Sequence, residues 1–119
     1  MLFGSLILTT ATTPIGAGER VSIRVSPAVA FAPANLVVRA SVEADEANRI
    51  MQIVAESQDF YRSSEVQLEG DKAPRTSMIE FRSVPPGTYE VRVTVMGSGG
   101  EQRAFARQQV NVIATVAGH

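Results

Sequence analysis

Hydrophobic and polar residues alternate with a period of two along most of the chain, a pattern that predicts β-strands with one buried face. The alternation is regular in residues 21–26, 36–44 and 89–95, where apolar side chains are separated by serine, threonine, arginine or glutamate. Pro27 and Pro33 follow the first of these stretches. Because proline cannot donate a backbone hydrogen bond, they predict an edge strand that is broken into two pieces.

Residues 45–58 fit two patterns. As a strand, alternate residues between Met51 and Ala55 face inward. As a helix, apolar residues between Ala47 and Val54 recur at helical spacing, and Asp45 is available as the N-cap. The neighbouring stretches all predict strands, and such a setting overrides helix propensity. We therefore expect a strand that follows a turn at residues 45–48.

Weaker alternation in the remaining chain predicts a short strand at residues 64–68, a polar loop at 69–74, a strand at 78–84 and a last strand at 102–113. In total, about seven short strands are separated by turn residues. This arrangement is typical of an all-β protein, and we expect an antiparallel, immunoglobulin-like β-sandwich. We assign residues 19–114 to this domain and residues 115–119 to a flexible tail.

A rigid turn precedes the most regular strand. Pro85, Pro86, Gly87 and Thr88 fit a type II β-turn, in which Pro86 presets φ to about −65° and Gly87 supplies the positive φ of the next position. The valines that follow alternate with charged or polar residues, so a slip of one residue would expose all of them. We expect this hairpin to form part of the core.

Residues 84–93, VPPGTYEVRV, resemble the turn and strand of bacterial immunoglobulin-like and fibronectin type III-like modules. Carboxypeptidase regulatory-like domains carry a similar element. The resemblance implies that Tyr89 forms a tyrosine corner, in which its hydroxyl bonds to nearby backbone. It extends as a strand pattern over residues 20–113, but its specific part is short, so it implies a fold and hardly a function. The chain lacks the cysteine pair and the tryptophan of antibody domains.

Composition excludes several kinds of site. The chain has no cysteine, so disulfides and thiolate metal sites are excluded, and its one histidine, His119, is the last residue. A terminal histidine is poorly placed for catalysis, and zinc or copper sites lack their usual ligands. We therefore expect no enzyme activity and no cofactor. The formal net charge is −1 and no run of Lys or Arg occurs, so we expect no nucleic-acid partner.

The charged residues of the strands and loops have simple explanations. Arginines occur singly in the predicted strands, as on a solvated sheet face: Arg24, Arg39, Arg82, Arg92, Arg103 and Arg107. Two acidic groups, Glu43 with Asp45 and Glu46, and Glu69 with Asp71, supply oxygen atoms of the kind that calcium prefers. Neither group has the spacing of a calcium-binding loop, so we expect them to keep the loops in water.

The segment Asp59-Phe60-Tyr61-Arg62 is the strongest candidate for a binding surface. Two aromatic rings beside an arginine can stack on a sugar or anchor a partner protein. Alternation favours a simpler explanation, in which Phe60 packs inward and Tyr61 alone is outside. Phe105 stands between two alanines and is predicted to be exposed, which indicates an assembly surface.

Residues 1–18, MLFGSLILTTATTPIGAG, contain no charge and begin with an apolar run. They end in small residues like those of a signal cleavage site, but no basic region comes first. The segment is either a truncated signal peptide, which we favour and which implies export to the periplasm or beyond, or an N-terminal arm. It is too short and too rich in Thr, Pro and Gly to span a membrane.

Three functional hypotheses follow. The first is an exported, non-catalytic immunoglobulin-like module with a structural or binding role, whose loops contact a protein or a cell-surface glycan. The second is a fibre or pilus-like subunit, a homo-oligomer in which the N-terminal arm adds a strand to a neighbour. The third is a carbohydrate-binding module that uses Tyr61.

Overall fold

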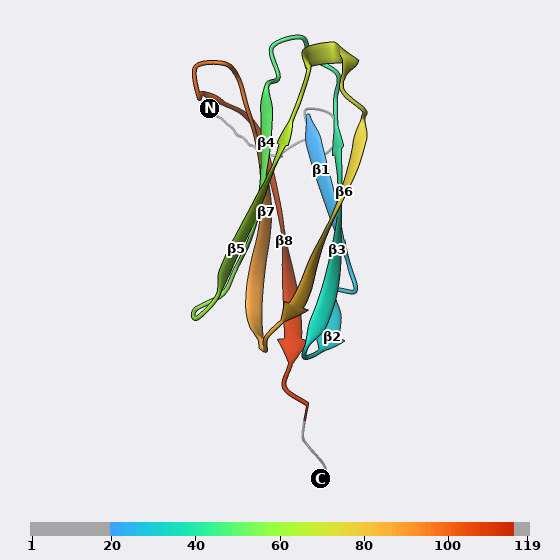
Figure 1. Ribbon diagram of the computed structural model, residues 1–119, viewed down its shortest axis with the longest axis vertical. Helices are drawn as coiled ribbons and strands as arrows, with labels where there is room; N and C mark the ends of the chain where they lie inside the picture. Colours follow the sequence, from blue (N-terminus) through green and yellow to red (C-terminus); the bar gives the residue numbers. More distant parts are fainter. Residues whose placement is uncertain (1–19, 116–119) are drawn as a thin grey trace, which may run out of the picture.

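Two β-sheets pack face to face in the computed structural model, which describes residues 20–115 (Figure 1). One sheet has the strand order β1-β3-β6, with β1 at Val21–Ser26, β3 at Ala34–Val42 and β6 at Thr76–Val84. The other has the order β2-β8-β7-β4-β5, with β2 at Val29–Phe31, β8 at Gln102–Ile113, β7 at Gly87–Met96, β4 at Ile50–Glu56 and β5 at Tyr61–Gln67. A single 3-10 turn in the described residues, Gly70–Lys72, joins β5 to β6. The β2–β8 pair is parallel, and the other pairs are antiparallel.

The prediction of an all-β protein is confirmed. The described residues form eight strands, whereas about seven were expected. The additional strand is β2, a three-residue piece between Pro27 and Pro33, so the predicted break at these prolines is confirmed. Residues 50–56 form β4, which confirms the strand interpretation of the ambiguous segment.

The core lies between the sheets and consists of the inward-facing residues of the alternating pattern. On β3, Leu36 and Val38 are fully buried, and on β7 the same holds for Val91 and Val93. Burying one such side chain contributes about 1.5–3 kcal/mol, so a one-residue slip of either strand would lose several such contributions at once. The register of the strands is therefore fixed by the alternation, and so is the identity of the residues that face the solvent.

The turn before β7 differs from the one predicted. Gly87 has a φ of 158° and is already the first residue of β7, so it does not take the φ of about +80° that the third position of a type II turn needs. The left-handed residue is Ser83, with a φ of 56°. Space at Gly87 is tight, because a Cβ atom there would lie 3.3 Å from the ring of Tyr89 and from the side chain of Ser57.

Tyr89 makes the hydrogen bond that the sequence resemblance implied. Its ring is 1% exposed, and its hydroxyl donates to the carbonyl oxygen of Pro85 over 2.7 Å. The edge of the Phe60 ring packs against it with centroids 5.9 Å apart. These contacts anchor the prolines to the core and explain why a rigid segment precedes a regular strand.

Predictions for the two chain ends fall outside the described residues. Those for residues 1–18, a signal peptide or an arm, concern a segment that the structure does not describe, and so does the prediction for His119. In residues 20–115 no helix is long and apolar enough to cross a membrane.

Candidate functional site

The outer face of the three-stranded sheet carries rows of polar residues that the strand register brings together. Ser22 on β1 pairs with Ser41 on β3, which pairs with Thr76 on β6, so three hydroxyl groups form one row. The Ser41 and Thr76 hydroxyl oxygens lie 3.4 Å apart. Two residues further along the strands, in the next row of solvent-facing residues, Arg24 on β1 lies opposite Arg39 on β3.

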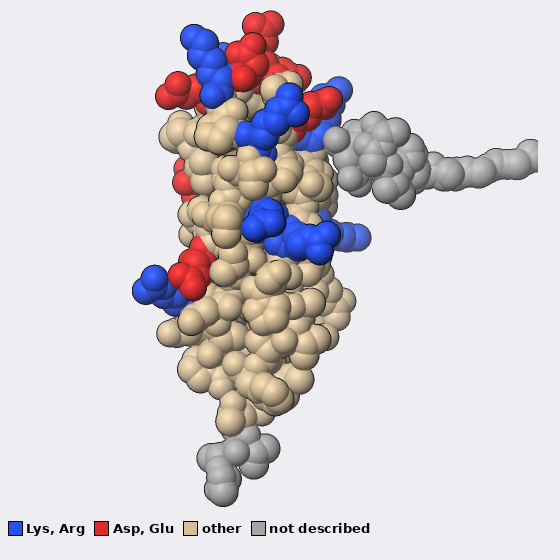
Figure 2. Space-filling view, turned by 90° about the vertical axis from the view of Figure 1, so that its right-hand side faces the viewer, with Lys and Arg blue, Asp and Glu red and all other residues tan. Residues whose placement is uncertain are grey.

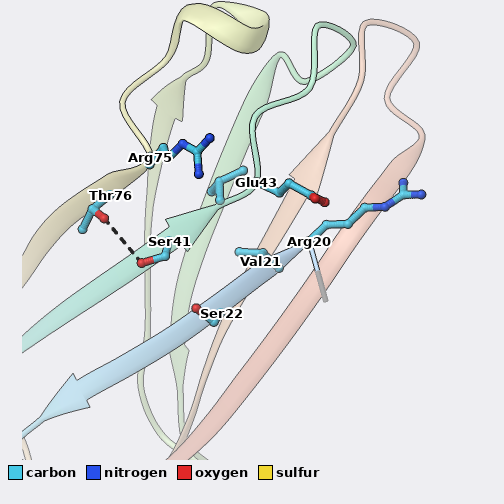
Figure 3. A pocket seen from close by; sticks show the side chains of 8 residues that line it. Arg20, Val21, Ser22, Ser41, Glu43, Arg75 and Thr76 are labelled. Carbon is cyan, nitrogen blue, oxygen red and sulfur yellow. Dashed lines mark hydrogen bonds between the residues drawn. The ribbon is translucent and has the colours of Figure 1, made fainter. Parts of the chain in front are cut away.

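Two further arginines flank the row of hydroxyl groups. Arg20, Arg75 and the three hydroxyl residues line an open hollow of about 510 Å³, together with Glu43 (Figure 3). Arg20 and Arg75 come from opposite sides of the hollow, and the carboxylate of Glu43 lies between them and points toward Arg20. The hollow therefore has a hydroxyl floor and a basic rim that contains one acidic group.

The arginines of this face differ from the other arginines because their guanidinium groups have no hydrogen-bond or ion-pair partner in residues 20–115. Within residues 20–115, six arginine side chains donate hydrogen bonds to carboxylates, amides or carbonyls: Arg49, Arg62, Arg82, Arg92, Arg103 and Arg107. The remaining four, Arg20, Arg24, Arg39 and Arg75, have no hydrogen bond or ion pair to a described residue, and all four lie on this side of the sheet. We call this surface the arginine face, defined by these four arginines with Ser22, Ser41 and Thr76.

The charge on the arginine face costs the fold stability. Like charges directly opposite each other on neighbouring strands repel, by roughly 0.2–1 kcal/mol per pair. Figure 2, in which β1, β3 and β6 face the viewer, shows basic side chains across the middle of this face with no acidic side chain beside them. An anion bound between these side chains would remove the repulsion and add charge-assisted hydrogen bonds.

On the opposite face of the molecule, the arginines of the middle strands are paired with carboxylates. On the outer side of the five-stranded sheet, Arg92 lies 2.9 Å from Glu56 and 3.1 Å from Glu90, and Glu90 also pairs with Arg107 at 3.3 Å. The hydrogen bond to Glu56, followed by the attraction of the two carboxylates, raises the pKa of Arg92 above its usual range. This network spans β4, β7 and β8 and leaves no unpaired charge among its members.

A second cluster fixes the loop between β3 and β4. Asn48, which is 6% exposed, donates to the Glu43 carbonyl and accepts a 3.1 Å hydrogen bond from Arg103 Nε. Arg103 also contacts the Asp45 carboxylate at 2.9 Å. The backbone N–H of Ala47, which donates to the same carboxylate, lowers the pKa of Asp45 most, and Arg103 adds to the shift.

The acidic residues that were considered for calcium at this loop make other contacts. Asp45 is engaged by Ala47 and Arg103, and Glu43 points toward the hollow of the arginine face. In residues 20–115 no three carboxylate, histidine or cysteine side chains gather as a metal site would require. Of the acidic residues of this loop, Asp45 therefore holds the loop in place through Arg103.

The residues predicted as a binding surface are not brought together. Phe60 packs against the core, the Arg62 guanidinium lies 5.0 Å from its ring centroid, and Arg62 donates to the Arg82 carbonyl at 2.6 Å. Tyr61 is 56% exposed on the opposite side of β5. Phe105 is 42% exposed on β8, three strands away from β5, so the spacing between strands alone separates it from Tyr61 by roughly 14 Å. The four residues therefore do not form one continuous surface, and a binding role for any of them stays a prediction.

Sequence reasoning missed the arginine face because it treated the arginines as isolated. Arg24 and Arg39 are fifteen positions apart, and the register of β1 with β3 alone makes them neighbours. The sequence did indicate that both arginines face the solvent, because Arg24 and Arg39 each occupy a polar position in a clearly alternating strand. Placing the two strands as antiparallel neighbours would have paired these residues.

The chain resembles solved structures but no characterised family. No protein-family model matches it, and no curated protein does. Among the solved structures that match is a superoxide reductase (neelaredoxin) from Ignicoccus hospitalis. Its TM-score is 0.62, at 16% sequence identity over 79% of this chain and 80% of that chain. At this identity the likeness concerns the fold alone.

These comparisons contradict the family and function expected from the sequence. The resemblance to immunoglobulin-like and fibronectin type III-like modules finds no family model or curated relative, and the structural neighbour is a protein of another kind. That neighbour is an enzyme, which contradicts the prediction of a non-catalytic exported module, its fibre and carbohydrate-binding alternatives, and the exclusion of enzyme activity. The error arose because VPPGTYEVRV specifies a turn and a buried strand, which sandwiches of different families share.

The described residues do not fit a redox centre of the kind that superoxide reduction needs. Electron transfer in proteins relies on a metal ion or another redox group. Residues 20–115 contain no cluster of metal-ligating side chains, the chain has no cysteine, and its one histidine lies outside these residues. The activity named for the structural neighbour is therefore not assigned to this chain.

Proposed function

We propose that the protein recognises oxyanion groups, in the form of an acidic polypeptide, through the arginine face. The observation that supports this proposal most directly is that Arg24 and Arg39 lie opposite each other without a partner in residues 20–115. A surface that keeps such a pair gives up stability that a single neutral residue would restore. Binding of a carboxylate between the two guanidinium groups accounts for this arrangement.

The chemistry of the arginine face matches a carboxylate-bearing ligand. Guanidinium groups present paired N–H donors that fit the two oxygens of a carboxylate. The hydroxyl groups of Ser22, Ser41 and Thr76 each add a donor in the adjacent row. One ligand chain that crosses both rows would therefore meet charged donors first and neutral donors next.

A polypeptide with spaced acidic residues suits this surface better than a densely charged polyanion. Glu43 stands on the rim of the hollow, and Glu80 follows Met78 on the outer side of β6. Closely spaced phosphates would meet these carboxylates as well as the arginines. A polypeptide can place its carboxylates opposite Arg24 and Arg39 and an apolar side chain on Met78, which is 57% exposed.

The proposal is tested by titrating the full chain, at low ionic strength, into a fluorescent peptide in which six glutamates alternate with leucines. In the variant Arg24→Gln/Arg39→Gln the affinity should fall by roughly 2- to 30-fold, since each exposed charged contact contributes about 0.2–1 kcal/mol. The matched control, Arg82→Gln/Arg107→Gln, removes two positive charges from arginines that already have carboxylate partners. Its affinity should stay close to that of the unchanged protein.

Equal losses in the two variants would mean that net charge alone governs binding and would contradict a defined site. A single-stranded oligonucleotide and a sulfated oligosaccharide of equal charge serve as further probes. If either binds more tightly than the peptide, the partner is not an acidic polypeptide, although the arginine face remains the site.

We also propose that the strands of the sandwich are connected as in immunoglobulin-like domains. This proposal concerns the order of the strands and does not assign the chain to the immunoglobulin family. It is supported by the separation of β1, β3 and β6 from β8, β7, β4 and β5, which parallels the two sheets of immunoglobulin-type sandwiches. The Tyr89–Pro85 hydrogen bond adds a feature that such sandwiches share. An experimental structure with another strand order would contradict this description. Export of the protein stays a prediction from residues 1–18.

A further inference from the structure

We propose that the free edge of β5 pairs with β5 of a second copy of this chain, which joins two five-stranded sheets across a two-fold axis. β5 is the outer strand of its sheet, bonded on one side to β4 (Figure 1). All seven of its residues pair with β4 in unbroken register, without a bulge, proline or glycine. Such a strand presents a regular row of backbone groups on its other side.

Two backbone hydrogen bonds show which groups of β5 point away from β4. Ser57 donates to the Phe60 carbonyl and Leu68 donates to the Arg49 carbonyl, which identifies the even-numbered residues as the ones bonded to β4. In an antiparallel pair the alternate residues then direct N–H and C=O outward. These residues are Tyr61, Ser63, Glu65 and Gln67, and no side chain of residues 20–115 bonds to their backbone.

The other sheet edges are partly occupied or interrupted. At β1, the Gln108 amide accepts from Val25 N–H at 2.9 Å and donates to the Val25 carbonyl at 3.3 Å. At β6, Arg62 bonds to the carbonyl of Arg82, next to the left-handed Ser83. The edge strand β2 has three residues and lies between two prolines. Pairing with another chain is therefore least hindered at β5.

The side chains of β5 suit pairing with themselves. A two-fold axis through Ser64 overlaps the full strand and places Tyr61 opposite Gln67 of the other copy, and Ser63 opposite Glu65. No like charges then face each other. A shift of the axis to Glu65 would bring two carboxylates together, which disfavours that register. In the full-length register the four outward residues of each copy exchange about eight backbone hydrogen bonds.

The test is sedimentation equilibrium of the full chain, with variants that change the charge opposite Glu65. The unchanged protein should form a dimer in a concentration-dependent manner. Ser63→Glu places two like-charge pairs across the axis and should raise the dimer Kd by roughly 2- to 30-fold. Ser63→Lys places two opposite-charge pairs there and should lower it. The double variant Ser63→Glu/Glu65→Lys should restore a dimer of about the original affinity.

Two results would overturn the proposal. One is a monomer at about 1 mM, a concentration at which even a millimolar dimer is visible. The other is a dimer whose affinity does not depend on the sign of the charge introduced at Ser63. Melting temperatures of all variants, which should differ little because Ser63 is exposed, separate loss of pairing from loss of folding.

Discussion

Arg24 on β1 lies directly opposite Arg39 on β3, and neither guanidinium group has a hydrogen-bond or ion-pair partner in the described residues 20–115. The five-stranded sheet contains a comparable pair of arginines on neighbouring strands. Arg92 and Arg107 also face each other across paired strands, and Glu56 and Glu90 neutralise them. The difference between these two arginine pairs is the basis of the proposed function.

Replacing Arg24 by glutamine should stabilise the protein. The change removes the repulsion between Arg24 and Arg39 and should raise the free energy of unfolding by roughly 0.2–1 kcal/mol. Urea unfolding at low ionic strength measures the difference, and added salt should reduce it because salt screens exposed charges. Arg107→Gln, which breaks the contact with Glu90, is the control and should not stabilise. A loss of stability in Arg24→Gln would show that this side chain has a favourable contact.

Replacing Tyr89 by phenylalanine should cost about 1 kcal/mol. The ring stays in the core, but the hydroxyl no longer donates to the carbonyl oxygen of Pro85. Denaturant midpoints of the two proteins give the value. Tyr61→Phe is the matched control, because the hydroxyl of this exposed residue has no hydrogen bond to a described residue and its loss should have little effect. Equal midpoints for Tyr89→Phe and the unchanged protein would exclude a contribution from this bond.

Replacing Asn48 by alanine should cost about 1–3 kcal/mol, because it leaves the Glu43 carbonyl and the Arg103 guanidinium without a nearly buried partner. Thermal unfolding measures the loss. Gln102→Ala, at an exposed residue beside the same cluster, is the control and should change the melting temperature little. Similar shifts in both variants would mean that the Asn48 cluster does not hold the loop.

The protein should lose part of its stability in acid through Asp45. The hydrogen bond from the Ala47 N–H, with a further contribution from Arg103, holds the folded-state pKa of Asp45 below its usual value, so the ionised form stabilises the fold. That stabilisation is present above the unfolded pKa and is lost as the pH falls through the lower, folded pKa. Urea midpoints from about pH 5 to pH 2 should fall less steeply in Asp45→Asn than in the unchanged protein. Parallel curves would contradict the assigned shift.

The sequence predicted the strands well where the alternation of apolar and polar residues was regular. It predicted the backbone poorly at the turn before β7, where tertiary packing determines the conformation. β3 and β7 follow the period of two almost without exception, because one face of each is buried. The turn at Pro86 and Gly87 was misjudged because a Pro-Gly pair fits several backbone paths, and the packing of Gly87 against Tyr89 selects an extended one. Local sequence does not contain that contact.

The candidate site was less predictable than the fold. Arg24, Arg39 and Arg75 come from three strands or strand ends, and the sheet register alone makes them neighbours of one hydroxyl row. The aromatic residues drew attention because Phe60 and Tyr61 are adjacent in sequence. Adjacent residues of a strand point to opposite faces, so adjacency separates their side chains.

The most direct test of the proposed function is an NMR titration of the full chain with the peptide of alternating glutamates and leucines. Backbone amides of β1, β3 and β6 should show saturable shifts, and those of β7 should show none. The shifts should be centred on the row of hydroxyl groups and the arginine pair: Ser22, Arg24, Arg39, Ser41 and Thr76. Shifts that do not saturate, or that are centred on the network of Arg92 and Glu90, would contradict the assignment of the arginine face as the binding site.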